Sequence, residues 1–153
     1  MSLQPDTLNH DAICQRLPHA GAMCLLDTVE AWSDSRIHCR ASSHRDPHNP
    51  LRSEDGLPAL AALEYGAQGM AVHGALLAAS GPARAGYLAA VRDLQVQPAP
   101  LDGLEHPLDI HAERLLSDAG SSIYLLEITA GGRAVLSARA TVILQPADEE
   151  PAP

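Results

Sequence analysis

The longest apolar stretch of the chain predicts a helix from about Pro58 to Ala79. Proline suits a first helical position, where its missing N–H would have had no partner, and Ser80-Gly81-Pro82 ends the stretch. The apolar residues that recur in it at helical spacing are Leu60, Leu63, Ala67, Met70 and Ala71. Much of this helix should therefore be buried.

Segments rich in apolar and β-branched residues flank the helix and predict strands. The two expected before it cover about 24–31 and 36–43, and the four after it cover about 86–97, 108–116, 122–130 and 134–144. Asp118-Ala119-Gly120 and Gly131-Gly132 mark tight turns between the last three. One long helix among such strands predicts an α+β fold with a mainly antiparallel sheet wrapped on the helix.

Three glycines interrupt the expected helix, at Gly66, Gly69 and Gly74. Each lowers helix propensity by about 1 kcal/mol relative to alanine. Their presence indicates close backbone packing where the curved sheet meets the helix.

The length of 153 residues suits a single domain over residues 1–153, and no linker or internal repeat divides it. Its core should cover about 10–145 and begin with a short helix at about 10–16. Residues 1–9 are a loose lead-in, and the acidic, proline-rich residues 146–153 should form a disordered tail.

Composition and charge exclude several kinds of function. The chain has no lysine, which removes Schiff-base chemistry and the lysine of a phosphate-binding P-loop. A net charge of −9 disfavours nucleic acid as a partner. No leader precedes the domain and no apolar run is long enough to span a bilayer, so a cytoplasmic location is expected. We therefore expect Cys14, Cys24 and Cys39 to be reduced, buried thiols.

A carboxylate in the apolar helix and a histidine in the preceding loop are the candidate catalytic groups. Glu64 lies in the second turn of the helix, where burial would raise its pKa, and Gln68 on the same face is a possible hydrogen-bond partner. His48 lies in the irregular stretch 43–57 and could serve as a base, and His44 on the same loop is the alternative. A base and a carboxylic acid that face adjacent carbons of a substrate could remove a proton from one carbon and a hydroxyl from the other.

The start of the helix offers donors for a developing negative charge. The N–H groups of Ala59 and Leu60 would be free at the positive end of the helix dipole. A carbonyl oxygen that becomes an oxyanion is stabilised by such donors. We expect no metal and no cofactor: His44 and His48 have ligand-like spacing but lack a clear third ligand.

Three motifs lie within residues 17–68: Leu17-Pro18-His19 with the apolar stretch to Asp27, His48-Asn49-Pro50, and Leu57-Pro58 with Glu64 and Gln68. Together they resemble the motifs of the β-hydroxyacyl-carrier-protein dehydratases, which have the hotdog fold. The opening Leu17-Pro18-His19, followed by an apolar stretch that ends at Asp27, is similar to the family's first motif. His48-Asn49-Pro50 resembles its catalytic His-x-Pro. Leu57-Pro58 with Glu64 and Gln68 resembles the opening of its central helix. Ala71-Val72-His73-Gly74 is similar to an extension found in a divergent branch of the family, which is associated with specialised acyl chains.

The resemblance implies a dehydratase that converts a 3-hydroxyacyl thioester, carried on acyl carrier protein or CoA, into a trans-2-enoyl thioester. It also implies a homodimer or higher homo-oligomer in which His48 of one subunit faces Glu64 of the other. His73 lies on nearly the opposite helix face from Glu64 and should pack or contact a subunit.

The chain departs from the family pattern at two points. Ala59 replaces a glycine, and the interval from His48 to Glu64 is longer, with Ser53–Gly56 as the insertion. The insertion leaves the choice between His48 and His44 open. Two other functions remain as alternatives: a hotdog thioesterase acting on acyl-carrier-protein or CoA substrates, and a non-catalytic acyl-binding hotdog subunit.

Overall fold

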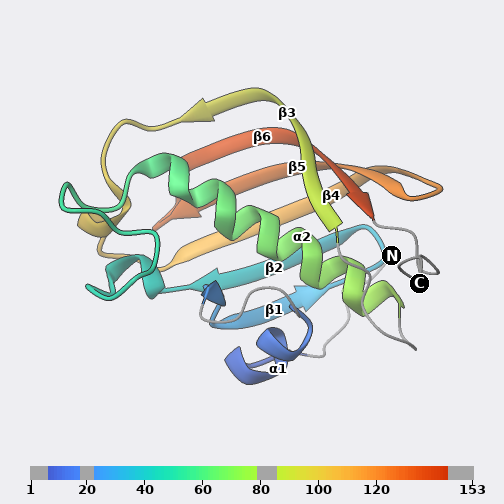
Figure 1. Ribbon diagram of the computed structural model, residues 1–153, viewed down its shortest axis with the longest axis horizontal. Helices are drawn as coiled ribbons and strands as arrows, with labels where there is room; N and C mark the ends of the chain where they lie inside the picture. The colour runs from blue at the N-terminus through green and yellow to red at the C-terminus, as the bar shows by residue number, and fades with distance from the viewer. Residues whose placement is uncertain (1–6, 18–22, 79–85, 145–153) are drawn as a thin grey trace, which may run out of the picture.

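A computed structural model of the chain describes residues 7–17, 23–78 and 86–144. In these residues a single antiparallel sheet of six strands lies against one long helix, α2 (Ala62–Ala78), in the strand order β1-β2-β4-β5-β6-β3 (Figure 1). The strands are β1 (Thr28–Trp32), β2 (Arg36–Ala41), β3 (Gly86–Val96), β4 (Leu108–Asp118), β5 (Ser121–Ala130) and β6 (Arg133–Leu144). The expected α+β plan is confirmed, with every predicted strand present.

Tight turns join the last three strands at the predicted positions. Gly120 (φ +82°) connects β4 to β5, and Gly131 (φ +58°) with Gly132 (φ +81°) connects β5 to β6. These left-handed backbone conformations are open to glycine without the steric cost that a side chain would add. The hairpins they form place β5 at the centre of the long strands.

The long helix begins as a 3-10 turn over Ala59–Ala61 directly after Pro58 and continues as α2. Its buried face contacts β2, β4 and β5. The buried residues are Ala62, Tyr65, Gly66, Gly69, Met70, Val72 and His73. The core beneath them consists of aliphatic side chains such as Ile110, Leu126 and Ile128 from the sheet.

The predicted buried stripe of this helix is wrong in its phase. Of the five residues expected inside, only Met70 is buried, while Leu60 is 52% exposed, Ala71 is exposed, and Leu63 and Ala67 are half-buried. Small residues and an aromatic ring face the sheet because the sheet comes close to the helix backbone. Of the other residues expected in the core, Leu60 and Ala71 are exposed, whereas Leu63 and Ala67 pack against the edge of the core.

The glycines confirm this close approach at two positions. A Cβ at Gly66 would lie 2.8 Å from Leu126 Cδ1, and one at Gly69 would lie 3.2 Å from Ile110 Cγ2. At Gly74 a Cβ would meet nothing within 4 Å, so the packing explanation fails for that residue.

The short helix α1 (His10–Gln15) confirms the predicted N-terminal helix and begins where Asn9 Oδ1 accepts a hydrogen bond from Ala12 N–H at 2.9 Å. The prediction of reduced thiols is wrong for two cysteines. Cys14 on α1 and Cys24 before β1 form a disulfide, because the chain between them brings their Cα atoms to 5.7 Å, within the range that a disulfide needs. Cys39 is a free, buried thiol, as expected, and burial raises its pKa to about 12.

Several sequence-based expectations lie outside the described residues: the lead-in before residue 7, His19 of the first motif, the end of the helix at 79–82, and the tail at 146–153. Within the described ranges, no helix is both long and apolar enough to cross a membrane.

Candidate active site

His48 lines a cleft of about 440 Å³. Its side chain is exposed, and its backbone N–H donates to Asp46 Oδ1 at 2.8 Å, which fixes a turn after the 3-10 turn Ser43–Arg45. The other residues lining the cleft come from α1, from the segment before β1 and from the loop after β2. They are His10, Cys24, Leu25, Asp27, Ser42, Ser43, Asp46, Asn49 and Pro50.

A chain of hydrogen bonds ties this loop to the central helix. Ser43 Oγ donates to Leu25 O at 2.7 Å, so its single hydrogen is used and it accepts from the Tyr65 hydroxyl at 2.8 Å. Tyr65 in turn accepts from Asn49 Nδ2 at 3.0 Å, and the same amide group donates to Ser43 O at 2.8 Å. The loop that carries His48 is therefore held against the helix turn that carries Glu64.

Glu64 is exposed in the single chain, so the expectation of a buried carboxylate is not met there. At 100° per residue, Glu64 lies about 150° from the centre of the buried face of α2. It belongs to the apolar stripe formed by Leu60, Leu63, Ala67 and Ala71. Among the described residues no hydrogen bond joins Glu64 to His48, and Glu64 does not line the His48 cleft.

Gln68 does not partner Glu64, which corrects that expectation. Its Oε1 accepts from Leu25 N–H at 2.8 Å, and its Nε2 donates to Met23 O. One helix turn beyond Glu64, the amide side chain thus points toward the segment before β1. Gln68 holds the wall of the cleft in place.

His44 is buried, in contrast to His48, and does not line the cleft. Leu104 O accepts from its Nε2 at 3.2 Å, so the neutral ring carries its proton there, while Nδ1 is buried without a partner among the described residues. Burial lowers the pKa of His44. His44 packs the loop onto the 3-10 turn Leu101–Gly103.

The start of the helix is fixed by Asp102 rather than by a cap. Asp102 Oδ1 accepts from Leu57 N–H at 2.9 Å, and its other oxygen lies 3.2 Å from Arg52 Nη2. The bond from Leu57 is the main cause of the lowered pKa of Asp102. No side chain among the described residues caps the turn at Pro58, so no side-chain oxygen there accepts from the N–H groups of Ala59 and Leu60. Ala59 is buried, and Leu60 is 52% exposed.

His73 has the structural role that its helix face indicated. Its Nε2 donates to Ser33 O at 2.8 Å, and its Nδ1 accepts from the Tyr124 hydroxyl at 2.7 Å. Both side chains are buried, and desolvation is the main cause of a lowered pKa for His73 and of a pKa of about 12 for Tyr124. The pair joins α2 to β5.

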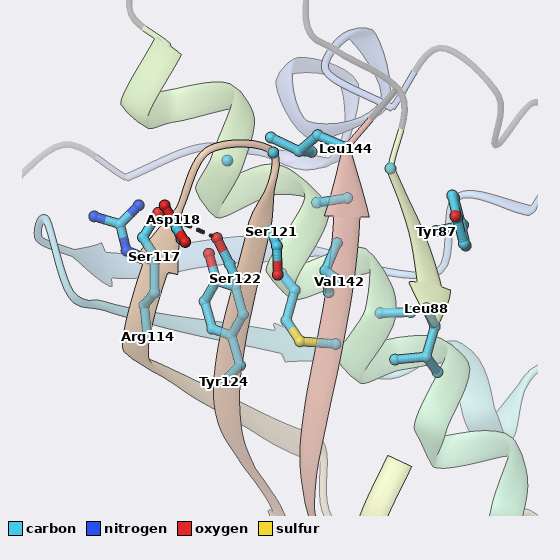
Figure 2. Close-up of a pocket in the computed structure, with 16 residues that line it drawn as sticks. Tyr87, Leu88, Arg114, Ser117, Asp118, Ser121, Ser122, Tyr124, Val142 and Leu144 are labelled. Atoms are coloured by element: carbon cyan, nitrogen blue, oxygen red, sulfur yellow. Dashed lines mark hydrogen bonds between the residues drawn. The ribbon is translucent and has the colours of Figure 1, made fainter. Parts of the chain in front are cut away.

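A second cavity of about 290 Å³ lies between α2 and the sheet (Figure 2). Ala67, Ala71 and Gly74 line it from the helix, on the side of α2 that also carries Glu64. Leu88 and Val142 line it from the strands β3 and β6, and Arg114, Ser121 and Ser122 lie at the β4–β5 end (Figure 2). Such a cavity has the mixed apolar and polar walls typical of small-ligand sites.

Sequence reasoning missed the residues that hold the loop, namely Tyr65, Asn49 and Ser43. One signal was available. A tyrosine inside an apolar helix needs a partner for its hydroxyl, but nothing in the sequence pointed to residues 16 and 22 positions earlier.

Of the two histidines with ligand-like spacing, His44 is buried and His48 is exposed. Within the described ranges, only His10, Cys14 and Cys24 bring three possible ligand atoms within 4.8 Å of one another. The two sulfurs are bonded to each other and are not independent ligands.

Comparison with solved structures identifies the fold. The dehydratase heterocomplex ApeI:P from Xenorhabdus doucetiae contains a chain that is 29% identical, with a TM-score of 0.78 over 90% of this chain and 93% of that one. A thioesterase from Haemophilus influenzae is 10% identical, with a TM-score of 0.66 over 99% and 100%. A mutant thioesterase from Pseudomonas aeruginosa is 12% identical, with a TM-score of 0.60 over 95% and 99%. The two thioesterases share the hotdog fold alone, which confirms the expected fold.

No curated protein matches the chain. A family model, ApeP-like, described as ApeP dehydratase, matches residues 12–152. That match includes the loop of His48, the whole central helix and all six strands. The chain therefore belongs to the ApeP-like dehydratase family of hotdog proteins.

Proposed function

We propose that the protein removes water from a 3-hydroxyacyl thioester to give a trans-2-enoyl thioester, with His48 as the base and Glu64 as the acid. The observation that carries this assignment is the bonded pair Asn49–Tyr65. Each member directly follows one of the two proposed catalytic residues, so the bond sets the His48 loop beside the Glu64 turn. The family match supports the reaction class.

In the proposed reaction the imidazole of His48 takes the proton from Cα. Glu64 donates a proton to the hydroxyl that leaves Cβ as water. Negative charge develops on the thioester oxygen, and the N–H groups of Ala59 and Leu60 donate to it at the positive end of the helix. Gln68 contributes by holding the Met23–Leu25 wall, in place of the direct substrate contact that the sequence suggested.

A second hotdog subunit completes this site in our proposal. The apolar stripe of α2, with Leu60 at 52% exposure, surrounds Glu64 and is open in the single chain. Covering it would exclude water from Glu64 and leave the substrate hydroxyl as the partner of its carboxyl group. A homodimer was the expectation from sequence. The similarity to a chain of a dehydratase heterocomplex supports a different hotdog subunit as the covering partner.

The acyl chain would be presented by acyl carrier protein or CoA in the cytoplasm. Its far end would enter the cavity lined by Ala67, Ala71 and Gly74. Ala67 is three residues after Glu64, about 4.5 Å along the helix axis at 1.5 Å per residue. Membership of the ApeP-like family favours the acyl chains of aryl polyene biosynthesis over those of housekeeping fatty acids.

The decisive experiment is mass spectrometry of 3-hydroxyacyl-carrier-protein substrates incubated with the protein, alone and with a co-purified hotdog partner. Loss of the mass of one water indicates dehydration. Release of the free acid would support the thioesterase alternative instead, and an unchanged substrate in both incubations would support the non-catalytic subunit.

Variants test the two roles separately. We expect Glu64→Gln and His48→Ala each to lower the dehydration rate by about 10²- to 10⁴-fold, the usual contribution of a positioned acid or base. Matched controls are Glu127→Gln and His111→Ala, which are exposed, paired residues on β5 and β4. Full activity in either test variant removes that residue from the mechanism.

A further inference from the structure

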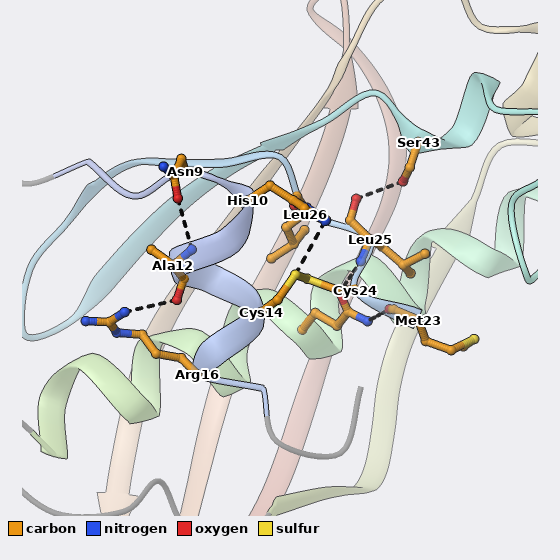
Figure 3. The surroundings of a disulfide bond; sticks show 11 residues. Asn9, His10, Ala12, Cys14, Arg16, Met23, Cys24, Leu25, Leu26 and Ser43 are labelled. Atoms are coloured by element: carbon orange, nitrogen blue, oxygen red, sulfur yellow. Dashed lines mark hydrogen bonds between the residues drawn. A yellow bond between two sulfur atoms is a disulfide. The ribbon is translucent and has the colours of Figure 1, made fainter. Parts of the chain in front are cut away.

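The disulfide between Cys14 and Cys24 has a histidine beside it (Figure 3). His10 lies one helix turn before Cys14 on α1, and its Nε2 is 3.5 Å from Cys14 Sγ. None of these three residues takes part in the proposed dehydration. They form a separate cluster at one side of the His48 cleft.

The hydrogen bonds of His10 define which ring nitrogen faces the sulfur. Its Nδ1 is 2.7 Å from Leu26 O, and because a carbonyl only accepts, the proton of the neutral ring is on Nδ1. Nε2 therefore presents a lone pair to Cys14 Sγ. A disulfide sulfur has no hydrogen to donate, whereas a thiol would donate to Nε2 and a thiolate would pair with the imidazolium. The ring is placed to suit the reduced form of Cys14.

The two cysteines differ in their relation to the cleft. Cys24 lines the cleft of about 440 Å³ together with His48, whereas Cys14 does not line it. Both cysteines are half-buried, and His10 is exposed. A thiol entering the cleft therefore meets Cys24 first, with Cys14 as the sulfur that leaves.

We propose that Cys14–Cys24 is a thiol–disulfide exchange site in which His10 stabilises the departing Cys14 sulfur. The co-reactant is a low-molecular-weight thiol of the glutathione class. The entering thiol gives its proton to His10 Nε2, and its thiolate attacks Cys24 Sγ, where a new S–S bond forms. The Cys14–Cys24 bond breaks with the electron pair on Cys14, and the Cys14 sulfur takes that proton back from His10 Nε2. A second thiolate attacks the mixed disulfide, so two thiols are oxidised to one disulfide and both cysteines are reduced.

The surroundings of the disulfide favour a redox-active bond over a purely structural one. In a cytoplasmic protein, disulfides are uncommon and usually catalytic or redox-sensing. Asp27 and Asp46 line the same cleft and oppose negative charge on a thiolate, so the neighbouring imidazole is the group that offsets them. Cys24 is also flanked by Met23 and Leu25, the two residues held by Gln68. The exchange would therefore alter the wall of the His48 cleft.

The test begins with the unmodified full-length chain, equilibrated in mixtures of reduced and oxidised glutathione, alkylated and mapped by peptide mass spectrometry. We expect Cys14 and Cys24 to pass reversibly between disulfide and thiols while the fold is retained by circular dichroism. Cys39 is the internal control, because its buried thiol, with a pKa of about 12, should stay unlabelled. A disulfide that is reduced only in denaturant overturns the proposal.

His10→Gln tests the role of the imidazole. In the reduced protein at pH 7, we expect iodoacetamide to label Cys14 at least about tenfold more slowly in His10→Gln than in the unchanged chain, since the thiolate is the reacting form. His106→Gln, an exposed histidine outside the cleft, is the matched control. Equal labelling rates in the unchanged chain and His10→Gln also overturn the proposal. Neither readout uses an acyl substrate, so the outcome is independent of the proposed dehydration.

Discussion

At the scale of single residues, the Tyr65 hydroxyl connects more of the candidate site than any proposed catalytic group. It donates to Ser43 Oγ and accepts from Asn49 Nδ2, so it joins the helix to the loop on both sides of His48. Burial is the main cause of its raised pKa, which keeps it a neutral donor. Tyr65 is therefore a positioning residue whose loss should affect the loop before it affects the core.

Tyr65→Phe tests this role because it keeps the ring and removes only the hydroxyl. We expect unfolding free energy to fall by about 1–3 kcal/mol, the usual cost of leaving buried polar groups unpaired, and dehydration to slow because His48 is less well placed. Urea denaturation and the mass-spectrometric assay measure the two effects. Tyr87→Phe, at a residue that is 55% exposed on β3, is the control. Equal stability in both variants would contradict the role assigned to the hydrogen bonds.

The two buried histidines predict sensitivity to acid. Desolvation lowers the pKa of His44 and of His73 in the folded chain. Below the ordinary histidine pKa of about 6.5, the unfolded chain therefore binds more protons than the folded one, and unfolding free energy falls as pH falls. Each group contributes up to about 1.4 kcal/mol per pH unit until its folded-state pKa is reached.

Denaturation curves between about pH 7 and pH 5 measure this slope, over the window just below the ordinary histidine pKa. His73→Gln can still donate to Ser33 O or pair with Tyr124, but it cannot titrate. We expect it to be less stable at pH 7 and to lose less stability on acidification than the unchanged chain. An unaltered slope in both His73→Gln and His44→Gln would show that other groups cause the acid sensitivity.

At the scale of single residues, the sequence predicted which residues belong to the candidate site better than it predicted their contacts. The His-x-Pro pattern marked His48, which the fold places in a cleft, and helix phase correctly kept His73 away from Glu64. The partner of Gln68 was wrong because local spacing on a helix competes with contacts from residues 43 to 45 positions away, which no short-range rule contains. The disulfide was missed for a different reason: the expected cytoplasmic location favoured reduced thiols, although Cys14 and Cys24 are only 10 residues apart.

At the scale of elements, α2 packs closely on the sheet at Gly66 and Gly69. Strands and turns could be predicted because alternation and glycine turns are local signals. The phase of the helix could not, because nearly all of its faces are apolar or small, and only the sheet decides which face is covered. Gly66 lies on the covered face, where a Cβ would be too close to the side chain of Leu126.

Two glycine substitutions in the same helix separate packing from helix propensity. Gly74→Ala adds a Cβ that meets nothing within 4 Å, so we expect a gain of about 0.5–1 kcal/mol in unfolding free energy. Gly66→Ala has the same gain in propensity but forces Leu126 aside, at a cost of about 1–3 kcal/mol. Thermal or urea denaturation should give a lower unfolding free energy for Gly66→Ala than for Gly74→Ala. Equal stabilities would mean that the core beside Leu126 adapts freely.

At the scale of the whole molecule, the single chain does not bring the two proposed catalytic residues into one closed site. His48 lies in one cleft, Glu64 lies on an open apolar stripe, and the cavity beside α2 begins between that stripe and the sheet. The sequence predicted both catalytic candidates but could not show that the helix turns its carboxylate outward. The outward direction is what makes a second subunit part of the argument, because only a covering surface can desolvate Glu64.

Leu63→Arg tests whether a second hotdog subunit covers the stripe around Glu64. Leu63 is half-buried there, and a charge at its position would cost several kcal/mol to bury in an interface. We expect light scattering and co-purification to show loss of the partner, whether a second copy or a different hotdog subunit, together with dehydration, while the chain remains folded. Leu116→Arg, at a residue 59% exposed on β4, is the matched control and should keep both. Retained association and activity in Leu63→Arg would mean that the partner binds elsewhere and that Glu64 works in contact with solvent.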